Sequence, residues 1–199
     1  MTDDVSTAAF LSLVSGRRGH FLLESGLHGG LWLDLDALFA DARRIAPFVG
    51  ALSAALGKHR PEVICGPLLG GAFLAQLVAI ESGLEFAYTE PRAAPTAGAL
   101  FAARYALPKA YQSRLSGKRV AIVDDVMSAG SSLRATHAAL VEAGAQVVAA
   151  GALLLLGRVG AAHFAARGVP VEAVAKDAYE TWEPASCPQC AAGVAVETV

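Results

Sequence analysis

The residues best suited to chemistry stand together in segment 120–133, which reads VAIVDDVMSAGSSL. Four apolar residues lead into two adjacent acids, Asp124 and Asp125, and a run of small and hydroxyl residues follows. The apolar run is typical of a buried strand, and the residues after Gly130 have the pattern of a helix. The segment therefore predicts a strand, a tight loop and a helix, with two carboxylates where the strand ends.

This arrangement suits a ligand that carries an anion at one end and hydroxyl groups at the other. A helix N-terminus offers unpaired N–H groups to a phosphate. Gly130 allows close approach of the backbone, and Ser128, Ser131 and Ser132 add hydroxyl donors. The two carboxylates can accept hydrogen bonds from a diol, so a ribose 5-phosphate meets both demands. Two acids before a turn also occur in α/β proteins where they bind no ligand, and the acids alone leave that alternative open.

Alternating strands and helices are predicted around this segment, which implies a mostly parallel central sheet flanked by helices on both faces. Residues 90–116 show no clear period and are interrupted by proline and glycine, which is typical of a functional connection. The periodic elements are a helix at 3–14, strands at 20–24 and 31–36, a helix at 42–59, a strand at 62–65, a helix at 72–82, strands at 85–89 and 119–123, a helix at 131–143, a strand at 147–156, a helix at 161–167 and a strand at 171–175.

Composition narrows the class of protein. The 199 residues are 54% hydrophobic and 17% charged, which indicates a globular chain with a large core. The net charge of -2 gives no basic excess for nucleic acid. The longest apolar run, 147–156, is too short to span a membrane, and the N-terminus carries acids where a signal peptide needs bases. We therefore expect a cytoplasmic protein without a nucleic-acid or membrane partner.

The segment VAIVDDVMSAGSSL resembles the signature with which type I phosphoribosyltransferases bind 5-phosphoribosyl-1-pyrophosphate (PRPP). The resemblance implies the α/β fold of that family. It also implies that Asp124 and Asp125 hold the ribose 2′ and 3′ hydroxyls. The residues that would cradle the 5′-phosphate are Ser128, Ala129, Gly130, Ser131 and Ser132.

Further segments are similar to orotate phosphoribosyltransferases. GPLLGG resembles the family's pyrophosphate loop, which makes Leu69, Gly70 and Gly71 candidates for PRPP binding. LLLLGRVG places Arg158 where the family has an arginine that contacts the orotate carboxylate, and an arginine fork suits a carboxylate.

The two ends of the chain carry the same resemblance. GHFLLESGLHGGLWLDLDAL is similar to the family's N-terminal hood, and by that similarity Phe21 and His28 would face orotate. The tail CPQCAAGV is similar to the C-terminus of some bacterial members. We expect three parts: a helix and hood at 1–40, a PRPP-binding core at 41–176 and a tail at 177–199.

The sequence differs from the family's pattern at two places that matter for catalysis. Region 90–116 lacks the usual Lys-x-x-Lys-x-His arrangement, so Arg92 and Lys109 are the candidates to neutralise pyrophosphate. Gly157 also stands where the family has an aspartate before Arg158. Three interpretations therefore remain: an orotate phosphoribosyltransferase, a phosphoribosyltransferase for another base, and a PRPP-binding regulator without turnover.

For the first interpretation, the resemblance implies that orotate and PRPP give orotidine 5′-monophosphate and pyrophosphate, a step of pyrimidine nucleotide biosynthesis. It also implies Mg²⁺ as the cofactor, catalysis by Asp124 and Asp125 with the loop cations, and a homodimer.

The cysteines and hood histidines suggest no further chemistry. Cys187 and Cys190 form one C-x-x-C, but zinc needs four ligands and Cys65 belongs to a predicted core strand. We expect that these two thiols have no functional role and that protein side chains hold no metal there. His20 and His28 are expected at the surface, although His28 could approach the substrate.

Overall fold

The structure is a computed structural model that describes residues 7–23, 26–35, 38–92 and 104–198. A six-stranded sheet forms its centre, and all neighbouring strands are parallel except for the antiparallel pair β4–β5. This confirms the predicted mostly parallel sheet. The strands, in spatial order, are β5 (Arg104–Ala106), β4 (Glu85–Arg92), β3 (Val63–Pro67), β6 (Arg119–Met127), β7 (Gln146–Leu156) and β8 (Val171–Asp177).

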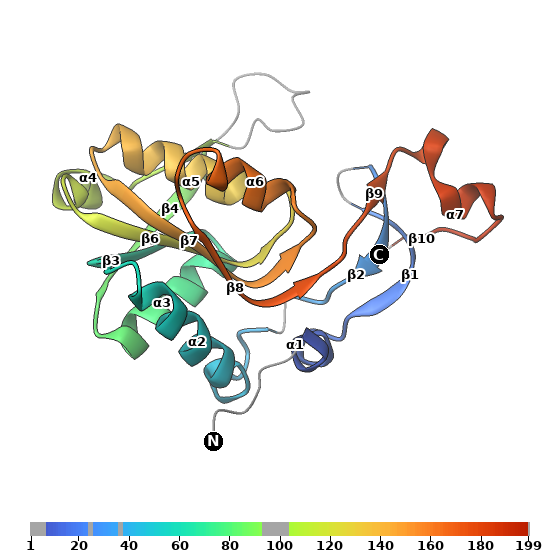
Figure 1. Cartoon of the computed structure of the whole chain (residues 1–199), viewed down its shortest axis with the longest axis horizontal. Coiled ribbons are helices and arrows are strands. Elements are labelled where there is room, and N and C mark those ends of the chain that lie inside the picture. The colour runs from blue at the N-terminus through green and yellow to red at the C-terminus, as the bar shows by residue number, and fades with distance from the viewer. Residues whose placement is uncertain (1–6, 24–25, 36–37, 93–103, 199) are drawn as a thin grey trace.

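Helices cover both faces of this sheet (Figure 1). Successive residues of β6 point to opposite faces: Ala121 and Val123 belong to one apolar cluster, Val120 and Ile122 to the other. Burial on both sides explains why the strand is a continuous apolar run. The first cluster is covered by α1 (Thr7–Leu13), α2 (Ala42–Gly57) and α3 (Gly70–Ser82), and the second by α4 (Lys109–Leu115), α5 (Ser131–Glu142) and α6 (Val159–Ala165).

A second sheet, here called the hood sheet, joins the two ends of the chain. Its order is β10 (Glu197–Thr198), β1 (Arg17–Leu22), β2 (His28–Trp32) and β9 (Thr181–Trp182). Tail strands thus pair on both outer sides of the N-terminal hairpin (Figure 1). Between β9 and β10 lie a 3₁₀ turn, η1 (Pro184–Ser186), and a short helix, α7 (Pro188–Ala191).

Several regions differ from the sequence prediction, among them the hood and region 90–116. Both hood strands begin three residues earlier than predicted. Strand β2 also ends earlier, at Trp32, because Leu33 and Leu35 pack against the first apolar cluster instead of extending the hood sheet. Region 90–116 contains the end of β4, all of β5 and α4, which were too short to show a period. Predicted positions 3–6, 24, 36 and 93–103 lie outside the described residues. No described helix has the length and apolar character needed to cross a membrane.

Candidate active site

The acid pair lies in the last part of β6. The strand continues to Met127, so Asp124 and Asp125 belong to it, whereas the prediction ended it at Val123. Gly130 adopts a left-handed φ of 72°, a conformation that favours glycine, and α5 begins at the next residue. The half-buried loop from Ser128 onward therefore leads directly into the N-terminus of a twelve-residue helix.

The glycines of GPLLGG are required because this turn presses against the acid pair. A Cβ on Gly70 would lie 2.3 Å from Asp125 Oδ2, and one on Gly71 would lie 2.7 Å from Asp124 Oδ1. A Cβ on Gly66 would lie 1.9 Å from the Gly71 carbonyl oxygen. These contacts bring the β3–α3 turn and the end of β6 together.

The two segments meet at the switch point of the sheet. From β3 the strand order runs to β4 on one side and to β6, β7 and β8 on the other. In open α/β sheets, ligands bind outside the carboxyl ends of the strands at such a reversal. The predicted PRPP-binding residues Leu69, Gly70 and Gly71 therefore stand beside the two aspartates at the place where the fold favours a ligand.

The acid pair is electrostatically unfavourable as it stands. Burial raises the pKa of Asp124 well above its usual range, and the neighbouring Asp125 carboxylate raises it further. Burial also raises the pKa of Asp125, although the Val126 amide, which donates a 2.7 Å hydrogen bond to Asp125 Oδ1, opposes this. No ion pair joins either aspartate to a lysine or arginine in the described part of the chain. The pair therefore favours hydroxyl donors or a cation.

A cavity of about 410 Å³ opens beside the phosphate-type loop. Arg158, the residue before α6, is exposed at this cavity, and its guanidinium makes no hydrogen bond or ion pair within the described residues. An anionic ligand in the cavity would therefore meet a free cation. The lining residues are Leu23, Leu27, Ser128, Ala129, Ser131, Leu156, Gly157, Arg158, Val159, Tyr179 and Thr181.

The two hood residues predicted to face the base do not line this cavity. Phe21 is buried under the Arg17 guanidinium, 5.4 Å from its ring centroid. His28 is buried and its Nδ1 lies 2.8 Å from Nε2 of the equally buried His20. The expectation of two surface histidines is therefore wrong, because tail residues cover them. Leu23, Leu27, Tyr179 and Thr181 line the cavity instead. Leu23 and Leu27 belong to the hood segment that resembles the family, but none of the four was predicted from the sequence to bind a substrate.

The candidate cations separate into two groups. Arg92 ends β4, is exposed, and lies 3.3 Å from Glu90 in an ion pair. Its partner across the ladder is Arg104 in β5, and the next residue, Tyr105, donates a 3.4 Å hydrogen bond to the Leu68 carbonyl oxygen of GPLLGG. Arg92 and Arg104 thus lie at the edge of the central sheet where the parallel strands have their carboxyl ends.

Lys109 is placed differently. Because β5 runs antiparallel to β4, it carries the chain back toward the amino ends of the parallel strands, and Lys109 begins α4 beyond it. Arg104 is therefore the better-placed second cation. The sequence pattern gave no reason to prefer it over the other bases of this region.

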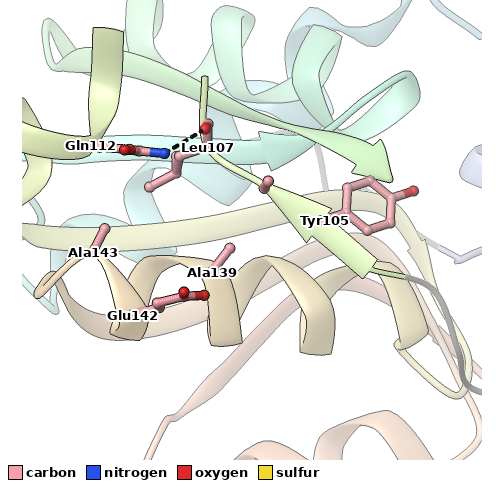
Figure 2. Close-up of a pocket in the computed structure, with 7 residues that line it drawn as sticks. Tyr105, Leu107, Gln112, Ala139, Glu142 and Ala143 are labelled. Carbon is pink, nitrogen blue, oxygen red and sulfur yellow. Dashed lines mark hydrogen bonds between the residues drawn. The ribbon is translucent and has the colours of Figure 1, made fainter. Parts of the chain in front are cut away.

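A second cavity, of about 260 Å³, lies between β5, α4 and α5 (Figure 2). Gln112 donates a 3.4 Å hydrogen bond to the Leu107 carbonyl oxygen at its edge. Its one charged lining residue is Glu142, and none of the predicted PRPP-binding residues lines it. An acidic wall repels phosphate, so this cavity is not the candidate site.

Known proteins share both the sequence and the fold. The phosphoribosyl transferase domain family matches residues 34–193. The orotate phosphoribosyltransferase of Thermotoga petrophila is 31% identical over 184 residues, which cover 90% of this chain and 88% of that protein. The enzyme of that name from Acidithiobacillus ferrooxidans is 30% identical over 196 residues, covering 97% and 94%.

Solved structures agree. The crystal structure of orotate phosphoribosyltransferase from Aeropyrum pernix superposes with a TM-score of 0.68 at 24% identity, covering 85% of this chain and 92% of that one. The Mycobacterium tuberculosis orotate phosphoribosyltransferase in complex with PRPP gives a TM-score of 0.61 at 20% identity, covering 87% and 96%. These superpositions establish the fold. The family match over residues 34–193 and the two relatives at 31% and 30% identity show that the chain belongs to the phosphoribosyltransferase family and, within it, to the orotate phosphoribosyltransferases.

Proposed function

We propose that this chain transfers the 5-phosphoribosyl group from PRPP to orotate, giving orotidine 5′-monophosphate and pyrophosphate in pyrimidine nucleotide biosynthesis. One observation carries the proposal: the acid pair lies against the glycine turn at the switch point, and the adjoining loop and Arg158 share one cavity. The relatives named above support this reaction, and the arrangement offers a candidate partner for each part of the two substrates.

Each group has a role that follows from its charge. The loop from Ser128 to Ser132 would take the 5′-phosphate at the α5 N-terminus, where amides and hydroxyls are donors. Asp124 and Asp125 would accept hydrogen bonds from the ribose diol. The turn at Leu69, Gly70 and Gly71 would present backbone N–H groups to pyrophosphate.

Arg158 would bind the orotate carboxylate through a bidentate fork, and this contact would distinguish orotate from bases without a carboxylate. Leu23 and Leu27 of the hood would cover the base, because they form the apolar wall of the same cavity. Phe21 and His28, which the family resemblance placed against orotate, would then act indirectly by holding the hood.

Catalysis would consist of positioning and electrostatic stabilisation. The bond from C1 to pyrophosphate breaks with cationic character on the ribose ring, and the carboxylates of Asp124 and Asp125 would stabilise that charge. Arg92, with Arg104 across the β4–β5 ladder, would offset the negative charge of the leaving group. Lys109 remains a weaker candidate for this role.

Mg²⁺ fits the donors present. Asp124 and Asp125 offer carboxylate oxygens without a partner cation among the described residues, and Mg²⁺ prefers oxygen ligands shared between carboxylates, waters and substrate phosphates. When bound with PRPP, Mg²⁺ would supply charge neutralisation on pyrophosphate.

The test is release of pyrophosphate from PRPP by the purified chain with Mg²⁺. Orotate-dependent release that uracil, adenine and hypoxanthine do not support is the expected result. Release only with another base would move the assignment to that base. Calorimetric binding of PRPP without turnover on any base would replace the enzyme by a PRPP-binding regulator.

We also infer a homodimer that acts in the cytoplasm. Phe73 and Ile80 are 44% and 73% exposed on α3, seven residues apart and hence on one face, with Leu77 between them. An apolar face of this kind suits a second copy of the chain. The cytoplasmic location follows from the proposed substrates, because orotate and PRPP are anions that do not cross a membrane unaided.

A further inference from the structure

Four potential metal ligands converge where the hood sheet meets the tail. His20 lies in β1, His28 in β2, Cys187 just before α7 and Cys190 within α7. Their nearest nitrogen and sulfur atoms all lie within 4.8 Å of one another. His20, His28 and Cys187 are buried, and Cys190 is exposed. The hood and tail residues are far apart in sequence, so only the fold brings them together.

The distances between these atoms match those around one tetrahedral metal ion. His20 Nε2 lies 2.8 Å from His28 Nδ1, 3.4 Å from Cys187 Sγ and 3.8 Å from Cys190 Sγ. Cys190 Sγ lies 3.4 Å from His28 Nδ1. Tetrahedral zinc, with bonds of about 2.0–2.3 Å, separates its ligand atoms by roughly 3.3–3.8 Å. To reach this geometry the two imidazole nitrogens must move apart by about half an ångström, and the other ligand atoms, all within 4.8 Å of one another, must close by at most about one ångström.

The hydrogen bonding of His20 prepares it for a metal. Its Nδ1 lies 2.8 Å from the Val194 carbonyl oxygen, which can only accept a hydrogen bond. Nδ1 therefore carries the proton, and in the neutral ring Nε2 keeps its lone pair directed into the cluster. Metal-binding histidines commonly donate their other N–H to a backbone carbonyl in this way. The tail thus contributes two thiols and the carbonyl that orients His20.

We propose that His20, His28, Cys187 and Cys190 bind one zinc ion as a structural Cys₂His₂ site. Two sulfur and two nitrogen donors in a tetrahedron favour Zn²⁺ over Mg²⁺, which prefers oxygen ligands. All four positions come from the protein, so the site is closed and has no place for a substrate. None of the four residues lines the cavity beside Arg158.

The zinc ion would fasten the tail to the hood. Besides the ligands and the His20–Val194 hydrogen bond, the described contacts between these parts include short β ladders of two residue pairs each, β1–β10 and β2–β9, and the surface ion pair Arg17–Glu197. Such contacts contribute little by themselves. A metal site that forms only in the folded chain adds its binding free energy to that junction. Leu23 and Leu27 of the hood and Thr181 of the tail would be held in place at the cavity as a result.

The proposal is tested on the full chain, purified without a histidine tag and under reducing conditions. Elemental analysis should find about one zinc per chain, and Cys187→Ser and Cys190→Ser should each reduce this to below about a tenth. Cys65→Ala, which alters a buried core thiol outside the cluster, and His59→Gln, which alters a histidine paired with Glu172, should retain the metal.

Because a serine variant could fail to fold, the unaltered chain supplies a second measurement. Removal of zinc with a chelator should lower Tm and weaken hydrogen-exchange protection in β1, β2 and β9, and added Zn²⁺ should restore both. Replacement by Co²⁺ should give the visible absorption of a tetrahedral thiolate site. Absence of zinc together with no uptake of Co²⁺, a Cys187–Cys190 disulfide that persists in reducing buffer, or retention of zinc by both serine variants would overturn the proposal.

Discussion

Arg158 is the residue on which base selection depends in the proposed reaction. It is exposed at the cavity and is paired with no described residue, so its replacement should leave folding intact. Arg158→Ala should reduce kcat/KM for orotate by about 30-fold, since a hydrogen-bonded ion pair contributes about 2 kcal/mol. Steady-state kinetics with varied orotate provide the measurement.

Arg158→Lys separates charge from geometry, because lysine keeps the charge and loses the fork. We expect an activity between those of the alanine variant and the unaltered chain. Arg167→Ala is the control, since Arg167 contacts His163 behind α6 and not the cavity. Equal orotate KM values for Arg158→Ala and the control would exclude carboxylate binding by Arg158.

The Asp124 carboxylate should support PRPP turnover but lower the stability of the fold at neutral pH. Burial and the Asp125 carboxylate raise the pKa of Asp124 above the ordinary value of 3.8, so the folded chain holds this proton more tightly than the unfolded chain. The resulting stability is present below 3.8 and is lost as pH rises through the higher folded pKa. Asp124→Asn should therefore raise Tm at neutral pH while PRPP turnover falls sharply.

Thermal unfolding across pH measures this effect. The Tm advantage of Asp124→Asn should shrink as pH falls toward 4, and a gain of about 1 kcal/mol would correspond to roughly 2–4 °C in a chain of this size. Asp41→Asn is the control of opposite sign, because hydrogen bonds from Arg43 lower the pKa of Asp41. A neutral-pH Tm for Asp124→Asn below that of the unaltered chain would contradict the argument.

At the scale of elements, the β3–α3 turn determines how closely the backbone approaches the acid pair. Gly71→Ala would place a Cβ 2.6 Å from Pro67 Cδ and 2.7 Å from Asp124 Oδ1. Overpacking of this kind typically costs about 1–3 kcal/mol. We expect a lower Tm and weaker PRPP binding, measured by thermal unfolding and calorimetry.

Gly57→Ala is the matched control for Gly71→Ala. Gly57 is the last residue of α2, and a Cβ there meets nothing within 4 Å. Its replacement should stabilise the chain by about 0.4–1 kcal/mol, because alanine restricts the unfolded state. Unchanged Tm and PRPP affinity in Gly71→Ala would show that the turn has more room than these contacts indicate.

The elements that could be predicted from sequence are those with a long period or a buried run. Helix α2 was predicted within two residues of its observed end, since five buried apolar residues repeat on one face. Strand β6 and its loop were identified because an apolar run, two acids and a glycine among small residues occur in one segment. Local pattern was sufficient for these elements.

The junction of hood and tail could not be predicted in the same way. The pairing of β1 with β10 joins Phe21 to Glu197, and no periodicity marks a strand of two residues. The burial of His20 and His28 involves tail residues distant in sequence, Val194, Cys187 and Cys190, so local sequence misassigned both histidines to the surface. For the same reason the cavity residue Thr181 went unnoticed, whereas Arg158 followed from a motif on a long strand.

At the scale of the whole molecule, the cavity is formed by two parts of the protein. The α/β core contributes Arg158 and the phosphate-type loop that follows the acid pair, and the hood contributes Leu23 and Leu27. The hood is anchored by the tail, which leaves the central sheet at the end of β8 and returns to pair with β1. Both ends of the chain therefore support the base side of the proposed site, while the phosphate side is built within the core.

The outer face of α3 governs the predicted assembly of two such molecules. Exposed Phe73 and Ile80 lie on the face opposite the core residues Leu74 and Val78, so a charge there should spare the fold. Ile80→Glu should convert a dimer into monomers, because burial of an unpaired carboxylate at an apolar interface is strongly unfavourable. Light scattering coupled to size exclusion gives the mass directly.

Val141→Glu, on the exposed side of α5, is the control that should remain dimeric. Since Ile80 lies near the C-terminal end of α3, nine residues after Gly71 of the proposed pyrophosphate turn, the monomer should retain its Tm-stabilisation by PRPP. A dimeric mass for Ile80→Glu would assign the interface to another face.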